Sequence, residues 1–203
     1  MLSHTVVSFP PRRRKSELEG LLDLSHHYKK VYSDKSNTGS LPRPLTGHSM
    51  SMIFQKRSTR TRVSTETGMA LLGGHALFLG PSDIQLGVNE TMRDTANVLA
   101  RFNDIILARV FGHADVVELA KYSSVPVINA LSDLHHPLQT LADLMALQEH
   151  FGKDLSGKTL AWCGDGNNVR IVVPLHAVLF YPHHKGLVGL TFIFCCCNFT
   201  GVA

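Results

Sequence analysis

The segment at residues 55–62, QKRSTRTR, places three hydroxyl side chains and four cations where an apolar run ends and a helical pattern begins. The first turn of a helix presents free N–H groups and the positive end of its dipole, so it is a natural site for an anion. Arg60 can hold a phosphate through two hydrogen bonds, while Ser58, Thr59 and Thr61 donate to its other oxygens. The alternative is that Ser58 only caps the helix and the cations form a solvated face.

Two more candidate residues stand at the ends of predicted elements. Arg109 closes an apolar run, and His136 precedes Pro137 at the start of a long helical pattern that also carries Gln139. Arg109 and His136 are both suited to hydrogen-bond an oxygen that gains negative charge. Taken alone, however, His136 could be a capping or packed histidine and Arg109 a surface residue.

The elements that must position these residues follow from an alternation of apolar runs and helical patterns. Continuous apolar strands separated by helices predict an α/β fold, a parallel sheet with helices on both faces. Ser16 and Glu19 predict a capping box for a first amphipathic helix, and Gly152 ends the last helix of the pattern. Strands are expected at 50–54, 75–79, 104–110, 125–129 and 159–163, and helices at 59–72, 92–101, 114–123 and 137–151.

The two ends of the chain differ from this pattern. Residues 1–15 contain no acid and carry a basic cluster, which is compatible with a targeting segment or a disordered start. The strand at 159–163 indicates the start of a second α/β domain, at 153–169, that is not completed. Residues 170–203, which also lack acids, are predicted to form a divergent tail. We expect the strand at 159–163 to leave an unpaired edge and the chain to be poorly soluble unless the tail folds back or the chain oligomerises.

Composition excludes several classes of protein. A hydrophobic fraction of 44% indicates a chain that builds a core, not a disordered polymer. The four cysteines, three of them adjacent at 195–197, give no disulfide framework and indicate a reducing compartment.

The modest net charge and the absence of an apolar stretch of ~18–20 residues argue against nucleic-acid and membrane partners. The paired histidines lack ligand spacing, so we expect no metal and no cofactor. Nucleic-acid binding by the basic clusters, with its steep salt dependence, is the alternative to a small-molecule site.

The motif STRTR at 58–62 resembles the carbamoyl-phosphate signature of the aspartate and ornithine carbamoyltransferases. Three further segments resemble motifs of that family in the same order: LARV at 107–110, HPLQ at 136–139 and GDGNN at 164–168. The last of these is similar to the ornithine branch. The resemblance covers about residues 16–169 and implies a carbamoyl-phosphate-binding domain at 16–152, followed by the start of an amino-acid-binding domain.

The resemblance implies a transferase that converts carbamoyl phosphate and L-ornithine to L-citrulline and phosphate, a reaction of the urea cycle and of arginine biosynthesis. Arg60 would neutralise the phosphate, and Arg109 and His136 would hydrogen-bond the carbonyl oxygen as it gains charge. Gln139 would orient the carbamoyl NH2 group and so fix the plane of attack. Asn168 would contact the ornithine.

The resemblance also implies a homotrimer in which Gln85 reaches the active site of the neighbouring subunit; the alternative is a solvated loop amide. The family's second-domain segments DxxxSMG and HCLP have no match in this sequence. We therefore expect impaired transferase activity, or a non-catalytic carbamoyl-phosphate-binding chain able to join family trimers. The ornithine branch and the acid-free start favour the mitochondrial matrix, with the cytoplasm as the alternative.

Overall fold

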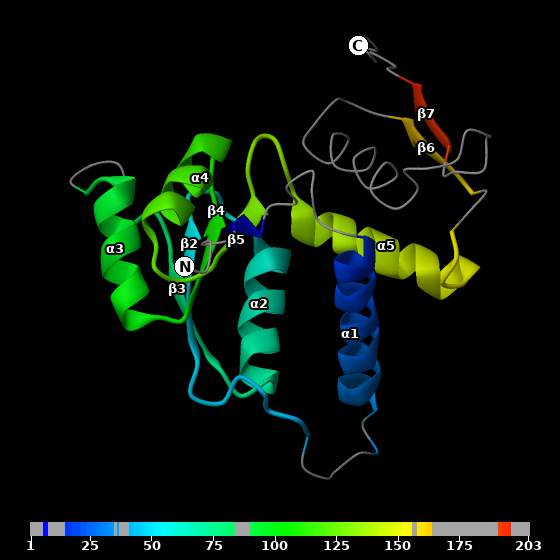
Figure 1. Cartoon of the computed structure of the whole chain (residues 1–203), viewed down its shortest axis with the longest axis horizontal. Coiled ribbons are helices and arrows are strands. Elements are labelled where there is room, and N and C mark those ends of the chain that lie inside the picture. The colour runs from blue at the N-terminus through cyan, green and yellow to red at the C-terminus, as the bar shows by residue number, and fades with distance from the viewer. Residues whose placement is uncertain are drawn as a thin grey trace, which may run out of the picture.

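The computed structural model describes residues 6–7, 15–34, 36, 41–83, 90–155, 158–163 and 191–195. Helices and strands alternate along most of this length (Figure 1), which confirms the alternation predicted from the apolar runs. In chain order the elements are β1 (Val6–Val7), α1 (Lys15–Ser33), β2 (Ser49–Phe54), α2 (Thr59–Leu71), β3 (His75–Leu79), α3 (Met92–Phe102), β4 (Ile105–Arg109), α4 (His113–Tyr122), β5 (Val127–Leu131), α5 (Pro137–Phe151), β6 (Thr159–Cys163) and β7 (Thr191–Cys195).

The main sheet has five strands in the order β1-β5-β4-β2-β3, and every neighbouring pair is parallel. The predicted α/β class with a parallel sheet is therefore confirmed. Because all these strands run in one direction, their carboxyl ends lie along a single edge of the sheet. In α/β sheets, that edge is where ligands bind.

Helices bury both faces of the sheet, as Figure 1 shows. Successive side chains of a strand point to opposite faces. On β2, Ile53 packs in a cluster with α3 and α4, whereas Met52 and Phe54 pack with α2 and α5. All three side chains are at most 1% exposed. A strand buried on both faces is mainly apolar, which is why the strands appear in the sequence as apolar runs, although β2 also buries Ser51.

Strand β5 begins two residues later than the predicted start at 125. The hydroxyl of Ser123 accepts a hydrogen bond from the Val125 N–H (3.1 Å) and donates one to the Val125 carbonyl (2.7 Å), which holds Val125 in a turn. Pro126 has no N–H to give to the ladder. The strand therefore starts at Val127, and it extends to Leu131 at the other end.

Two helices also begin earlier than predicted. Helix α1 already includes Lys15, so Ser16 lies inside its first turn and the predicted capping box is wrong, because an N-cap residue stands outside the helical backbone. Helix α4 begins at His113 because the Asp133 carboxylate accepts a hydrogen bond from the His113 N–H at 2.6 Å. The remaining boundaries differ by at most two residues from the predicted ones.

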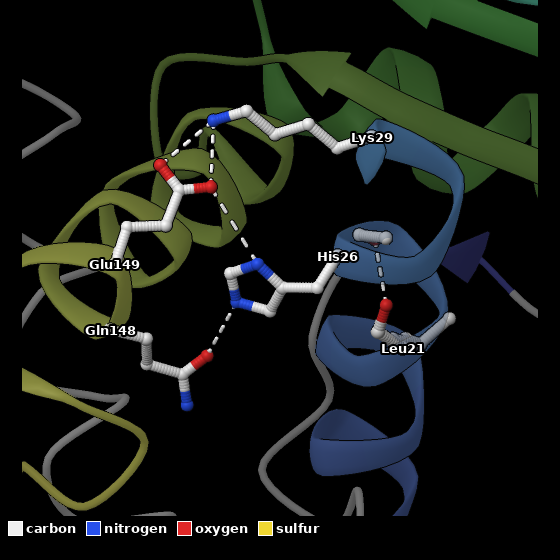
Figure 2. A network of polar contacts seen from close by, with 6 residues as sticks. Leu21, His26, Lys29, Gln148 and Glu149 are labelled. Carbon is white, nitrogen blue, oxygen red and sulfur yellow. Dashed lines mark hydrogen bonds and ion pairs between the residues drawn. The ribbon is translucent and has the colours of Figure 1, made fainter. Parts of the chain in front are cut away.

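Helix α1 packs against α5, at some distance from the sheet in Figure 1. Leu22 of α1 is 1% exposed and forms a small apolar cluster with Leu144 of α5 and with Leu155. Polar side chains surround this cluster. Figure 2 shows Lys29 donating to both carboxylate oxygens of Glu149, at 2.6 and 2.8 Å, beside the pair of His26 and Gln148 at 3.0 Å.

At 159–163 the structure has the predicted alternative in which the tail folds back onto the strand. Strand β6 pairs in parallel with β7, in register from Thr159 opposite Thr191 to Cys163 opposite Cys195. The apolar segment predicted to be a divergent tail thus supplies a strand that pairs with one edge of β6 in a two-stranded sheet. At the other end of the chain, β1 lies within the segment 1–15 and pairs with β5. Among the helices described here, none has the length and apolar character that a membrane crossing requires.

Candidate functional site

Three neighbouring strands end at the same level of the sheet. Phe54, the last residue of β2, pairs with Arg109, the last residue of β4, and Arg109 pairs with Leu131 at the end of β5. The ladder shifts its register between Ala108 and Arg109, a β-bulge of the kind found beside active sites. The loops that follow these strands therefore meet at the carboxyl edge, and they carry most of the candidate residues.

The loop after β2 forms the N-terminus of α2. Ser58 is the N-cap, with extended backbone (φ −160°, ψ 115°), and its hydroxyl accepts a hydrogen bond from the Thr61 N–H at 3.3 Å. The same hydroxyl donates to the Thr61 hydroxyl at 2.9 Å. The capping role of Ser58 is thus confirmed, and it orders the first turn. Arg60 and Thr59 are exposed, and neither has an ion pair or hydrogen-bonded side chain among the described residues.

Arg109 is half-buried at the end of β4. Its carbonyl accepts a hydrogen bond from the Gln55 N–H at 2.8 Å, whereas its Nε is buried and has no hydrogen-bond partner among the described residues. Burial lowers the pKa of the guanidinium, and the nearby positive charge of Arg60 lowers it further. An arginine stays protonated in spite of such a shift. Arg109 is therefore a cation with unused donor capacity, close to a second cation.

His136 occupies the N-cap position of α5, with φ −131° and ψ 70°, but its side chain makes no capping hydrogen bond. The alternative of a capping histidine is therefore excluded. Its Nδ1 is buried, with no partner in the part of the chain that the structure describes. Burial lowers the pKa of His136 to about 4, with a further contribution from the charge of Arg109. The ring is neutral at pH 7 and adds hydrogen-bonding capacity without charge.

The structure brings Arg60, Arg109 and His136 into one electrostatic group, because the charge of Arg60 acts on Arg109 and that of Arg109 on His136. Gln139 lies on the first turn of α5 and is exposed; its amide donates to Asp143 at 2.7 Å. Gln139 is thus turned toward its own helix. The two remaining candidates, Gln85 and Asn168, lie outside the described residues.

Two of the acids near this edge, Asp115 and Asp133, form hydrogen bonds with uncharged groups of the described residues. Asp115 accepts a hydrogen bond from the Gln55 amide at 3.0 Å, and Asp133 accepts one from the His113 N–H at 2.6 Å. Both carboxylates are thus engaged by uncharged donors. The arrangement concentrates positive charge and free donor atoms at one place, which suits a small ligand that carries an anionic group and a polar carbonyl.

Comparison with known proteins agrees with this geometry. The family model "Aspartate/ornithine carbamoyltransferase, carbamoyl-P binding domain" matches residues 12–149. The chain belongs to this family. The match contains the three strand ends and the N-termini of α2 and α5, so the carboxyl edge described above lies wholly inside the family's carbamoyl-phosphate-binding domain.

Individual relatives are ornithine carbamoyltransferases. The chloroplastic enzyme of Pisum sativum is 54% identical over 147 residues, 69% of this chain and 39% of the relative. The mitochondrial ornithine transcarbamylase of Gallus gallus is 52% identical over 163 residues, 80% of this chain and 44% of the relative. The crystal structure of a mitochondrial ornithine carbamoyltransferase from Coccidioides immitis superposes with a TM-score of 0.79 at 33% identity, covering 94% of this chain and 68% of that one. The chain spans between 39% and 49% of the first curated relatives.

Gln55 is a residue of this carbamoyltransferase-family site that the sequence did not single out. Its N–H donates to the Arg109 carbonyl, its amide N–H donates to Asp115, and its Oε1 accepts from the Phe111 N–H at 2.5 Å. One residue, through its backbone and its side chain, therefore joins the ends of β2 and β4 to the first turn of α4. The only sequence feature that points to Gln55 is its position as the first polar residue after the buried strand β2.

Lys56, the next residue, lies over the Phe111 ring with its Nζ 4.9 Å from the ring centroid, a cation–π contact beside the same edge. No group of three His, Cys, Asp or Glu side chains that could hold a metal ion occurs within the described ranges. The expectation that the site uses no metal stays a prediction.

Proposed function

We propose that this chain binds carbamoyl phosphate at the carboxyl edge of its main sheet. The observation that carries the proposal is that Arg109 Nε and His136 Nδ1 are both buried without a partner among the described residues, next to Arg60. Buried polar atoms in native proteins nearly always have a partner, so these two nitrogens call for one from outside the protein, a ligand or a water. Carbamoyl phosphate carries a dianionic phosphate next to a carbonyl. These two groups are complementary to the cations Arg60 and Arg109 and to the neutral ring of His136.

Each residue then has a physical role. Arg60 and the free N–H groups at the start of α2 bind the phosphate, together with the hydroxyls of Thr59 and Thr61, and the Ser58 hydroxyl would have to release Thr61 to donate as well. Arg109 and neutral His136 hydrogen-bond the carbonyl oxygen. These two bonds strengthen as the oxygen gains charge in the transition state, and this difference accelerates the reaction. Gln139 would have to turn away from Asp143 to reach the carbamoyl NH2 group.

The reaction we propose is that of the relatives named ornithine carbamoyltransferase. The δ-amine of L-ornithine attacks the carbonyl carbon, a C–N bond forms, the C–O bond to phosphate breaks, and L-citrulline and phosphate leave after the amine loses a proton. This is a step of the urea cycle and of arginine biosynthesis. Asn168 is our candidate for an ornithine contact, and Gln85 for a residue that acts in the neighbouring subunit of a homotrimer.

A second candidate function is carbamoyl-phosphate binding without turnover. It is compatible with the family match, which falls on the carbamoyl-phosphate-binding domain at residues 12–149. The domain division that fits is a carbamoyl-phosphate-binding domain at 16–152, the start of an amino-acid-binding domain at 153–169 and a divergent segment at 170–203. In this case the chain would join family trimers through its first domain, and its own transferase activity would be impaired.

Thermal unfolding of the whole chain with and without carbamoyl phosphate tests the binding proposal. At 100 times its dissociation constant the ligand should stabilise the folded state by ~2.7 kcal/mol. Arg109→Ala should abolish most of this stabilisation, whereas Arg101→Ala, on the exposed last turn of α3, should retain it. A cooperative transition that carbamoyl phosphate does not move would refute the proposal.

Citrulline formation by the purified chain separates the two candidate functions. Turnover that requires both carbamoyl phosphate and L-ornithine supports the transferase. Binding without turnover supports the second candidate, and sedimentation of the chain with a full-length ornithine carbamoyltransferase then tests whether mixed trimers form.

We also propose the mitochondrial matrix as the location, since relatives in Gallus gallus and Aquarana catesbeiana are named mitochondrial. A fluorescent protein fused behind residues 1–15 tests this; diffuse cytoplasmic fluorescence would contradict it.

A further inference from the structure

The loop between β5 and α5, residues 132–136, must hold His136 in place without help from the His136 side chain. That side chain makes no capping bond to α5, and its Nδ1 has no partner among the described residues. The orientation of the ring therefore depends on the backbone of the loop. A reacting group that is misplaced by about 1 Å loses much of its effect, so whatever fixes this loop controls the site.

Ser132 closes the loop on itself. Its N–H donates to the His135 carbonyl at 2.9 Å, and its hydroxyl accepts from the His135 N–H at 3.1 Å. The same hydroxyl accepts from the buried Asn129 amide at 3.3 Å. Ser132 is itself buried, so these bonds are protected from water. They fix the backbone on the residue immediately before His136.

His113, from the start of α4, attaches to this loop at three points. Its N–H donates to the Asp133 carboxylate at 2.6 Å, and its Nδ1 lies 3.0 Å from the Ser132 hydroxyl, a hydrogen bond whose donor depends on the His113 tautomer. Its ring also meets the His135 ring edge to face, with centroids 5.0 Å apart. Gly112, the N-cap of α4, supplies no capping side chain, so Asp133 of the loop caps this helix from outside.

We propose that His113 and Ser132 act as positioning residues for His136. They join α4 to the β5–α5 loop and hold the loop in the conformation that keeps the His136 ring half-buried beside Arg109. Neither needs to touch the substrate. The role in catalysis rests on the function proposed above, but the positioning itself is a property of the chain without ligand.

The titration of His136 reports this positioning directly. Burial is the main cause that lowers the pKa of His136, followed by the charge of Arg109. A loop that opens exposes the ring to water and moves its titration midpoint back toward 6.5. The charged and titratable groups around His113 and Ser132 are Asp133 and His135 of the loop, which contact His113, and Asp115 on α4.

The experiment is a pH titration of the His136 ring protons by NMR in the whole chain, with the resonance assigned by its loss in His136→Gln. His113→Phe keeps the ring contact with His135 but loses the Nδ1 hydrogen bond. This variant and Ser132→Ala should each raise the titration midpoint of His136 by about one pH unit or more. His113→Asn places an amide near the position of Nδ1, so the midpoint of His136 in this variant should equal that of the original chain, unlike in His113→Phe. His75→Asn, at the amino end of β3, is the matched control and should change nothing.

An unchanged His136 midpoint in cooperatively folded Ser132→Ala and His113→Phe would overturn the proposal. Equal shifts in His113→Phe and His113→Asn would also overturn it, because the hydrogen bond would then be irrelevant. Affinity for carbamoyl phosphate is a separate readout and should weaken about 3- to 10-fold in His113→Phe, the value of one hydrogen bond. If the original chain binds no carbamoyl phosphate, the proposed function fails while the titration still decides the positioning role.

Discussion

The carboxyl edge of the sheet and the contact between α1 and α5 differ in whether their charged side chains have ion-pair partners. Lys29 of α1 pairs with Glu149 of α5 at 2.6 Å, and Asp23 of α1 pairs at 2.7 Å with Lys153, which follows α5. At the edge of the sheet, Arg60 and Arg109 have no acidic partner among the described residues, although two carboxylates lie near. The charges at the helix contact are paired within the protein, whereas Arg60 and Arg109, our proposed ligand-binding cations, have no acidic partner in the described ranges.

The difference has an energetic consequence. A half-buried cation without a partner, placed near another cation, lowers the stability of the fold, and the lowered pKa of Arg109 expresses that cost. Groups with perturbed pKa values of this kind cluster at functional sites. At the contact between α1 and α5 the charges of Lys29 and Glu149 are paired, and the stability of this contact depends mainly on its buried leucines. Substitutions in the two regions should therefore separate stability from ligand binding.

The largest effect is expected at the helix contact. Leu22→Ala removes a side chain that is 1% exposed and should destabilise the chain by about 2–5 kcal/mol. The affinity of the folded protein for carbamoyl phosphate should stay within about twofold, because distant sites act additively. Denaturant unfolding and calorimetric titration provide the two measurements. Leu24→Ala, on an exposed position of the same helix, is the control and should change stability by less than about 0.5 kcal/mol.

The next effect compares two arginines of α2. Arg60→Ala should weaken carbamoyl-phosphate binding about 10- to 100-fold, because it removes charge-assisted hydrogen bonds to the phosphate. Arg62 instead pairs with Glu66 at 3.1 Å and lies over the Phe78 ring at 3.6 Å. Arg62→Ala should thus leave the affinity within about threefold and act on stability alone. Equal losses of affinity in both variants would show that α2 attracts the ligand only through its total charge.

A smaller effect concerns His136 and pH. In the unfolded chain this histidine titrates near 6.5, whereas its pKa in the folded protein is about 4. The unfolded state therefore binds more protons between these values, and stability is lost as the pH falls from about 6.5 to about 4. His136→Gln should remove about 1–3 kcal/mol of this loss at pH 4. The measurement is the unfolding free energy of both chains from pH 4 to pH 8; a difference that does not vary with pH would contradict the prediction.

The smallest effect is expected for the exposed pair of Lys29 and Glu149. The hydrogen bond from Lys29 holds the pKa of Glu149 below its usual value, so the attraction is lost as the pH falls through that lowered pKa. A double-mutant cycle with Lys29→Met and Glu149→Gln should give a small coupling that vanishes in 1 M salt, where the Debye length is about 3 Å. A coupling that survives high salt would indicate a pair shielded from solvent. Neither variant should alter carbamoyl-phosphate affinity.

Much of the fold was predictable because its signals are local. The apolar runs of β2 and β4 and the helix between Pro137 and Gly152 are visible in the sequence, and Ser58 is the N-cap that the sequence suggested. Two kinds of feature were not predictable. The late start of β5 depends on a turn closed by Ser123, and the pairing of β6 with β7 joins segments far apart in the chain.

The candidate site shows the same division. The motif at 58–62, Arg109 and His136 could be found from residue types and order. The contributions of Gln55 and His113 could not, because each acts through hydrogen bonds to residues that only the fold brings near: Gln55 through Arg109 and Phe111, and His113 through the loop of Ser132. A polar residue after a strand has no visible partner in a linear sequence.

The sequence by itself determined the α/β class, the helix N-terminus suited to an anion, and the family. These depend on hydrophobic periodicity, capping preferences and short motifs, which act over a few residues. Only the tertiary structure decided that Arg109 Nε and His136 Nδ1 are buried near Arg60 without hydrogen-bond partners among the described residues, and that Asp115 and Asp133 bind other groups. Burial and charge proximity are long-range quantities, set by the parallel register that aligns three strand ends, and the chemistry of this edge depends on them.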